Sequence, residues 1–336
     1  MALQKINTTG SIFTIAILAI ALVAAVMPLA AQTSTTSDDG SEPEVTHNTW
    51  TSGTPLPTPV TFAAAAVLKD EIYVVGGENA ANAIIADTQI YNPATNAWST
   101  GVSYPAGIAS ASAAVVENVF YVFGGTTNGT TPTNAVWAYN PKTKTWAAKA
   151  AMPTARWGAA VVVEKNIIYV AGGDIGNATS TVAVESYNPA TNTWTEEAPM
   201  LVAKQHSAAG LLGSLKAGYT IVVADGGLDN GTATGDNEGY DATTNKWTSL
   251  ASDPASRYAS CSGSIGAKFY DMGGDTASTF SDDFQLSKDK WTTTLASVPQ
   301  SVLFPASAVY KGQLYCIGGW ASFGGPIINN VQIYQP

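Results

Sequence analysis

The segment EIYVVGG (residues 71–77) decides the fold, because close copies of it return along the chain. The copies are VFYVFGG (119–125), IIYVAGG (167–173), KFYDMGG (268–274) and QLYCIGG (313–319). A further glycine pair, Gly226 and Gly227, has Val223 in place of the tyrosine. The six pairs begin at intervals of 48, 48, 54, 47 and 45 residues, at Gly76, Gly124, Gly172, Gly226, Gly273 and Gly318. Repeats of this length predict an array of similar small structural units.

An aromatic pair with a constant internal spacing follows each of the first five double glycines. In the first five units a tryptophan lies seven residues after a tyrosine or phenylalanine, within segments such as YNPATNAW (91–98). The aromatic residues are Tyr91, Tyr139, Tyr187, Tyr240 and Phe284, with Trp98, Trp146, Trp194, Trp247 and Trp291 after them. The second glycines are Gly77, Gly125, Gly173, Gly227, Gly274 and Gly319. We interpret these residues as structural, since glycine permits close backbone approach and the rings can stack between units.

The pattern of residues within each unit predicts four short strands. An Ala-, Val- and Ser-rich run comes first, the second strand ends at Gly-Gly, the third ends at the tyrosine and the tryptophan opens the fourth. The sixth unit stops after Tyr334 without a tryptophan, whereas THNTW (46–50) matches ATNTW (190–194). We therefore expect an all-β, six-bladed propeller over residues 45–336, with its last blade closed by the strand around Trp50.

These motifs resemble the Kelch-repeat β-propeller family, which shares its superfamily with galactose oxidase. The resemblance covers residues 45–336 and rests on six glycine pairs in register with five identical aromatic spacings. It implies a ring of blades whose loops bind other molecules. Galactose oxidase itself needs two histidines, two tyrosines and a cysteine for copper, but this chain has only His47 and His206, in distant units. We therefore predict no copper or other metal site and no cofactor.

The first 44 residues differ from the repeats. Lys5 precedes an apolar run from Ile12 to Ala31, and LAAQ (29–32) has small residues suited to signal-peptidase cleavage. Residues 1–31 are interpreted as a hydrophobic helix that is either a cleaved signal peptide or a retained membrane anchor. Residues 32–44 form a polar linker. Either alternative predicts a chain that is secreted or held at the cell surface, touching a membrane only through residues 11–31.

The composition of the chain limits the kinds of partner that it could bind. Charged residues make up 12% of the chain and the net charge is −10, so we expect no nucleic-acid partner. The two cysteines, Cys261 and Cys316, allow at most one disulfide. Both lie in strand-like apolar segments where a free cysteine also packs well, and the spacing does not decide between the two states.

Cations stand at one register position in three successive units. Arg156 and Arg257, the only arginines, lie sixteen residues before their glycine pairs, and alignment places Lys204 there with His206 close by. The resemblance to Kelch domains that bind acidic peptide motifs implies that these side chains line the central opening. An arginine cluster there would suit a carboxylate or sulfate. The alternative is that they pack against neighbouring loops.

Residues just after the glycine pairs are expected on the same face. Asp174, Asp275 and Trp320 are the candidates for ligand contact, and Phe323 adds a second aromatic ring near Trp320. Asn128, Asn177 and Asn230 begin Asn-X-Thr sequences in the same loop of three units, so we predict possible glycosylation there.

We conclude that the chain is most simply an exported interaction module for an unidentified protein or glycan. Catalytic residues are not assigned. One alternative is a carbohydrate-active enzyme resembling the sialic-acid mutarotases, in which Asp236 and Glu238 would act as acid and base. Another is a structural cell-surface or matrix protein. Resemblance of fold alone does not decide among them.

Overall fold

The strands of the protein form one ring of antiparallel sheets. The computed structural model describes residues 47–213, 220–274 and 279–336. Its main strands make six four-stranded sheets, which we number as blades in chain order. Blade 1 contains β3 (Ala64–Leu68), β4 (Glu71–Val75), β6 (Thr88–Asn92) and β7 (Ala97–Thr100); blade 2 contains β8 (Ser112–Val116), β9 (Val119–Phe123), β10 (Val136–Asn140) and β11 (Thr145–Ala148); blade 3 contains β12 (Ala160–Glu164), β13 (Ile167–Ala171), β14 (Val184–Asn188) and β15 (Thr193–Glu196).

The other three blades repeat this order. Blade 4 contains β16 (Ala208–Gly213), β17 (Thr220–Asp225), β20 (Asn237–Asp241) and β21 (Lys246–Leu250); blade 5 contains β22 (Cys261–Ile265), β23 (Lys268–Met272), β24 (Ser281–Gln285) and β25 (Lys290–Thr292); blade 6 contains β26 (Ala306–Tyr310), β27 (Gln313–Ile317), β28 (Val331–Gln335) and β1 (Thr49–Gly53). Two small sheets pair β2 (Val60–Thr61) with β5 (Glu78–Asn79) and β18 (Leu228–Asp229) with β19 (Thr232–Ala233), and a 3-10 helix spans Leu286–Lys288.

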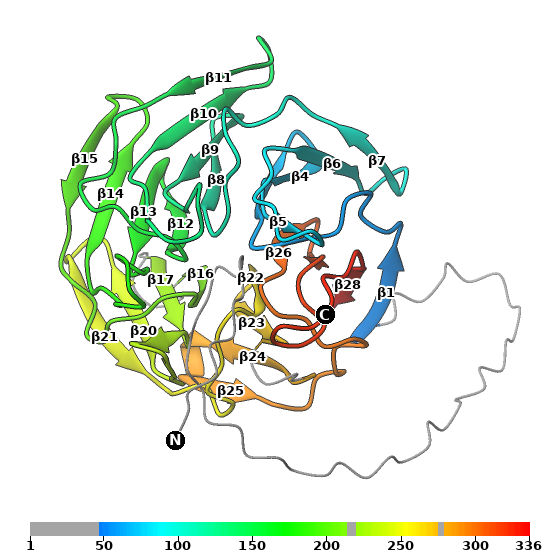
Figure 1. Cartoon of the computed structure of the whole chain (residues 1–336). Helices are drawn as coiled ribbons and strands as arrows, with labels where there is room; N and C mark the ends of the chain where they lie inside the picture. The colour runs from blue at the N-terminus through cyan, green and yellow to red at the C-terminus, as the bar shows by residue number, and fades with distance from the viewer. Residues whose placement is uncertain (1–46, 214–219, 275–278) are drawn as a thin grey trace, which may run out of the picture.

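The sheets surround a central axis, with β8, β12, β16, β22 and β26 nearest to it (Figure 1). Each first strand contacts the first strands of both neighbouring blades, in the closed order β3, β8, β12, β16, β22, β26 and back to β3. The all-β propeller expected from the sequence is confirmed. Small residues recur on these strands because six of them converge at the axis, where larger side chains would collide.

The N-terminal strand completes the last blade. β1 pairs with β28 along its whole length, and Trp50 lies opposite Tyr334. The indole N–H of Trp50 donates to the carbonyl of Ala296 at 2.8 Å, and its ring centroid lies 5.1 Å from that of Tyr334. The five internal tryptophans make the equivalent two contacts, with the aromatic ring of their own blade and a carbonyl in the connection from the preceding blade, as Trp98 does with Tyr91 and Thr54. The N-terminal and C-terminal strands of the propeller are therefore joined by backbone hydrogen bonds within one sheet.

The double glycines connect each blade to the next. The second glycine of every pair donates its N–H to a carbonyl of the following blade, as Gly173 does to Lys204 at 2.7 Å. A Cβ atom on Gly172 would stand 2.5 Å from that carbonyl oxygen, and Gly172 has a φ of 65°. Any side chain would therefore collide with the next blade and strain the backbone.

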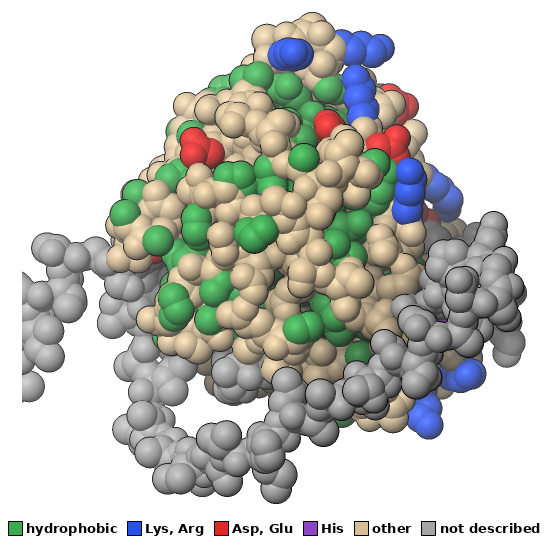
Figure 2. Space-filling view, turned by 90° about the vertical axis from the view of Figure 1, so that its right-hand side faces the viewer, with side chains coloured by type: hydrophobic (Ala, Val, Ile, Leu, Met, Phe, Trp, Pro, Cys, Tyr) green, Lys and Arg blue, Asp and Glu red, His purple; other side chains and the backbone are tan. Residues whose placement is uncertain are grey.

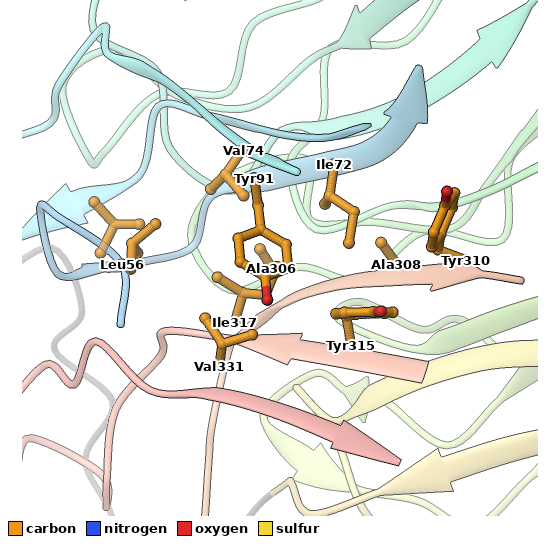
Figure 3. Close-up of a cluster of buried hydrophobic side chains, with 11 residues drawn as sticks. Leu56, Ile72, Val74, Tyr91, Ala306, Ala308, Tyr310, Tyr315, Ile317 and Val331 are labelled. Atoms are coloured by element: carbon orange, nitrogen blue, oxygen red, sulfur yellow. The ribbon is translucent and has the colours of Figure 1, made fainter. Parts of the chain in front are cut away.

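Wedges of apolar side chains fill the space between blades. Between blades 6 and 1, Leu56, Val74 and Ile317 lie together with Val331 and Tyr91, all almost fully buried (Figure 3). Leu56 comes from the connection into blade 1, Val74 from β4 and Ile317 from β27. Every blade offers the same three positions, and four of the six wedges fill them with buried apolar side chains in this way.

A disulfide joins blades 5 and 6. Cys261 on β22 and Cys316 on β27 are bonded, across a sequence separation of 55 residues. The repeat pattern left this bond undecided, because it does not define how closely two neighbouring blades approach each other. The predicted N-terminal helix and linker, residues 1–44, lie outside the described residues. Within the described residues no helix is both long and apolar enough to cross a membrane.

Candidate binding face

A ring of six backbone hydrogen bonds closes around the propeller axis. It is formed by the residue two positions before each first strand: Phe62, Ser110, Gly158, His206, Ala259 and Phe304. Each of these donates its N–H to the carbonyl of the equivalent residue in the preceding blade, at 2.7–3.1 Å, and Phe62 completes the circle by donating to Phe304. All six have φ between 50° and 58°. The left-handed conformation turns both N–H and C=O tangentially, so every polar group of the ring is satisfied.

Three aromatic side chains of this ring converge over the axis. The ring centroid of Phe304 lies 4.2 Å from Phe62 and 5.0 Å from His206. The imidazole of His206 also lies over Gly158, where a Cβ would meet it at less than 3.0 Å. A cavity of about 140 Å³, lined by these ring residues and their successors on the first strands, lies at this point. The axis is therefore a shallow depression in which aromatic rings lie beside polar groups such as Ser110 and Ser260.

The environment of His206 keeps its imidazole neutral. Burial lowers the pKa of His206 to about 4, because the charged form would lose its hydration without gaining a partner. His206 lies among the residues that line the depression at the axis and adds no positive charge there at neutral pH, and its contact with a ligand stays a prediction. The imidazole serves as a third aromatic ring between Phe62 and Phe304.

The predicted cations do not line the opening. Arg156 is 1% exposed and pairs with Glu185 of its own blade at 2.6 Å, while its guanidinium also donates to the carbonyls of Gly172 and Ala183. Lys204 is fully buried and pairs with Glu238 at 3.1 Å. The expectation of a solvent-facing basic cluster is thus corrected, since these cations form ion pairs with buried carboxylates inside the blades.

Arg257 follows the same arrangement with more partners. Its guanidinium contacts Asp253 at 2.8 Å and Asp282 of its own blade, and its Nη1 donates to the carbonyl of Asp271. Glu185, Glu238 and Asp282 occupy the same position, the second residue of the third strand. Blades 1 and 6 instead have Val60 and Val302 at the cation position, with Gln89 and Gln332 at the acid position. The cation position and the acid position thus differ together from blade to blade. This correlation within the sequence indicates that the two side chains are partners, and the prediction of a basic cluster did not use it.

Residues after the glycine pairs are also more buried than expected. Asp174 is 2% exposed and accepts the N–H of Gly176 at 2.6 Å, so it holds its own loop in shape, and burial raises its pKa. Trp320 is half-buried, 5.2 Å from Phe62 and 5.7 Å from Phe323 between ring centroids. Asp275 lies outside the described residues. Of these predicted contacts, only the Trp320 and Phe323 pair presents a surface next to the axis.

The two ends of the propeller carry different side chains. We call the end formed by the links between second and third strands, and between blades, the loop face; the tight turns form the turn face. All six exposed large hydrophobic residues of the described chain lie on the loop face: Val102, Ile175, Val182, Leu201, Phe280 and Phe323. Nine lysines lie on the turn face: Lys69, Lys142, Lys144, Lys165, Lys246, Lys268, Lys288, Lys290 and Lys311. Figure 2 shows the Lys and Arg side chains gathered along the top and right-hand edge of the view.

The loop face therefore offers apolar groups and few cations. Among the described residues, Lys149 at the end of blade 2 is half-buried, and the other three cations on this side are the paired Arg156, Lys204 and Arg257. An acidic ligand would find little to bind here.

The remaining predicted sites also lie in loops. Asn128, Asn177 and Asn230 are exposed on the loop face, in blades 2, 3 and 4, where their glycosylation stays a prediction. Glu238 accepts the backbone N–H groups of Leu201 and Val202 in addition to its pairing with Lys204. Asp236 is half-buried and accepts the hydroxyl of Thr234. Glu238 is thus committed to structure.

The ring of four-stranded blades, with its repeated Gly-Gly, Tyr and Trp contacts, defines a Kelch-type β-propeller. The family model described as the KLHDC2/KLHL20/DRC7 Kelch-repeats domain matches residues 35–209, more than half of the chain, and a Kelch-motif model matches residues 303–336. The chain belongs to the Kelch-repeat family. A solved structure titled "Structure of YjhT" is similar, with a TM-score of 0.70 and 19% identity over 82% of this chain and 95% of that one. No curated protein sequence matches the chain.

Proposed function

We propose that the protein is a binding module that recognises a protein or glycan through its loop face. The observation that supports this most is the separation of side chains between the faces. Ile175, Leu201 and Phe323 are 43%, 54% and 45% exposed on the loop face, while the nine lysines named above lie on the opposite face. Apolar groups exposed on one side of a soluble domain commonly mark an interaction site.

The ligand that fits this face is apolar or uncharged, with hydrogen-bonding groups. Trp320 and Phe323 meet nearly edge to face beside the shallow depression at the axis, and such rings suit a sugar face or an apolar peptide side chain. The buried pairing of Arg156, Lys204 and Arg257 argues against an acidic peptide. The enzyme alternative has no comparable support, because Glu238 is buried and paired with Lys204.

The proposal places the protein outside the cytosol. The Cys261–Cys316 disulfide supports this, because such bonds persist in oxidising compartments and are rare in the cytosol. The apolar run before the propeller is consistent with export, by cleavage or by anchoring. N-terminal sequencing of the protein from its native source would distinguish a start near residue 32 from an intact N-terminus.

The test is a binding screen against immobilised glycans and secreted proteins, using residues 45–336. A loop-face variant, Ile175→Asp/Leu201→Asp/Phe323→Asp, is expected to lose at least about tenfold in affinity for any ligand found, since a buried charge at an apolar contact is costly. The matched control, Lys142→Asp/Lys246→Asp/Lys290→Asp, adds as many aspartates to the turn face and should bind like the wild type. Equal loss in both variants, or loss only in the control, would refute the proposal.

A further inference from the structure

The wedge between blades 4 and 5 departs from the plan of the other wedges. Between blades 6 and 1, the three central positions are Leu56, Val74 and Ile317 (Figure 3). At the equivalent positions between blades 4 and 5 stand three aspartates, Asp253, Asp271 and Asp225. Asp253 lies four residues before Arg257 as Leu56 lies four before Val60, and Asp225 precedes its glycine pair as Ile317 does.

Other wedges confirm that these positions are ordinarily apolar. The equivalents are Val75, Tyr104 and Val122 between blades 1 and 2; Phe123, Met152 and Val170 between blades 2 and 3; and Met272, Val298 and Cys316 between blades 5 and 6. Each set belongs to a single cluster of buried hydrophobic residues. Three carboxylates thus occupy a place where this chain otherwise buries hydrocarbon.

The three aspartates meet at one point. Each contributes an oxygen, and these oxygens all lie within 4.8 Å of one another. Asp225 and Asp271 are fully buried and Asp253 is 3% exposed. Neither oxygen of the ionised Asp225 carboxylate accepts a hydrogen bond from an N–H or hydroxyl group, and the side chain is directed into the group, beside the carboxyl of Asp271. A buried carboxylate that accepts no hydrogen bond is costly, so something else must balance it.

Local cations leave this charge unbalanced. Lys204 is paired with Glu238, and Arg257 contacts Asp282 in the way that Arg156 contacts Glu185 in blade 3. Arg257 also bonds Asp253 at 2.8 Å, but it stands 3.9 Å from Asp271. Arg257 is thus shared by Asp253, Asp271 and Asp282, and its single positive charge cannot balance these three carboxylates together with Asp225. Burial, followed by repulsion from Asp271 and Asp253, raises the pKa of Asp225, which expresses the same imbalance.

We propose that Asp225, Asp253 and Asp271 bind a divalent cation, most suitably Ca²⁺, in the wedge between blades 4 and 5. A site made of carboxylate oxygens alone suits hard cations rather than zinc or copper. Oxygens that lie within 4.8 Å of one another can surround Ca²⁺, whose oxygen ligands lie at about 2.3–2.6 Å in flexible geometry, whereas Mg²⁺ demands a near-ideal octahedron at about 2.0–2.1 Å. The ion would join the second strands of two blades to the connection between them and so stabilise the ring.

The test uses the propeller, residues 45–336, freed of metal by a chelator and then dialysed. Calcium chloride is expected to bind with one ion per chain by calorimetry and to raise Tm by about 5 °C when free Ca²⁺ exceeds Kd a hundredfold. The variant Asp225→Ile/Asp253→Leu/Asp271→Val copies the wedge between blades 6 and 1. It should fold, as judged by circular dichroism, and show neither heat of binding nor a Tm shift.

Two further variants keep the result interpretable. Asp225→Asn is expected to weaken calcium binding at least tenfold while raising the Tm measured without calcium. Glu164→Gln changes a buried carboxylate on the turn face and should leave calcium binding unchanged. If Ca²⁺, Mg²⁺ and Mn²⁺ neither bind nor change Tm, a proton shared among the aspartates balances the charge and the proposal is wrong. Equal calcium binding by the apolar triple variant would overturn it as well.

Discussion

Arg156 and Glu185 form an ion pair of 2.6 Å between two buried side chains of one blade, and both positions change together elsewhere in the ring. In blades 1 and 6 the same two positions hold a valine and a glutamine. The amide of Gln89 bonds the backbone of Thr58, and Gln332 bonds Gln300. The side chain at the acid position thus holds the loop that enters the blade by hydrogen bonds. A cation is needed beside it only when that side chain is charged.

Removing one partner of this pair should be more damaging than replacing both. We expect Arg156→Val to lower the free energy of unfolding by about 3–5 kcal/mol, because Glu185 would remain charged in the interior. The double variant Arg156→Val/Glu185→Gln reproduces the combination found in blades 1 and 6 and should recover most of the loss. Guanidinium unfolding of the four proteins of this double-mutant cycle measures the coupling. A double variant no more stable than Arg156→Val would contradict this account.

The closing strand should contribute as much stability as an internal outer strand. Replacing Trp50 by alanine removes its contact with Tyr334 and its bond to the Ala296 carbonyl, and should cost roughly 2–3 kcal/mol because the ring is half-buried. Trp98→Ala is the matched control, since Trp98 makes the equivalent contacts from the outer strand of blade 1. Thermal unfolding of both variants compares them. A Trp50→Ala protein as stable as the wild type would mean that the ring does not depend on its N-terminal strand.

The fold could be predicted from the sequence because its determining residues are local and repeated. Every unit needs glycine at the positions equivalent to Gly172 and Gly173. A tight turn within each unit places the aromatic pair, such as Tyr187 and Trp194, opposite each other. The disulfide could not be predicted, because Cys261 and Cys316 belong to different units. Their distance depends on how two sheets are inclined, and no residue pattern within one unit records that angle.

The disulfide should stabilise the ring between blades 5 and 6. We expect Cys261→Ala/Cys316→Ala to lower the free energy of unfolding by about 3–4 kcal/mol, since the bond closes a long segment of the unfolded chain. Denaturant unfolding with and without reductant checks this. The reduced wild type should approach the double variant, which itself should not respond to reductant. An insensitive wild type would show that the bond contributes nothing.

His206 should make the protein less stable in mild acid. Its folded-state pKa of about 4 lies below the value near 6.5 of an unfolded chain, so between these values only the unfolded chain takes up the proton. Stability therefore falls as pH decreases, by about 2 kcal/mol at pH 5 from this group. Other groups, including Asp225 with its raised pKa, titrate in both proteins compared below.

The variant His206→Phe isolates this effect. Phenylalanine already occupies the equivalent ring position at Phe62 and Phe304, with the same left-handed backbone. Unfolding measured at pH 7 and pH 5 should show a smaller decrease for the variant than for the wild type. Identical pH dependence of the two proteins would show that His206 takes up its proton in the folded state.

The candidate site was harder to predict than the fold. The sequence reveals that Arg156, Lys204 and Arg257 share a register, but a side chain at the edge of a blade can point outward or into its own sheet. Their acidic partners decide the direction, and those lie about thirty residues later on a different strand. The loop-face hydrophobic residues have irregular spacing, because loops need not preserve the repeat. Only the assembled ring brings Ile175, Leu201 and Phe323 to one end of the molecule.

The six hydrogen bonds at the axis all run in one rotational sense, each blade donating to its predecessor. Every peptide group carries a dipole, but dipoles arranged head to tail around a circle cancel. The backbone at the centre therefore creates no electric field along the axis, unlike the end of a helix. This ring therefore adds nothing to the difference in polarity between the two ends of the propeller, and the charge of either end can be changed by surface substitutions without touching the ring.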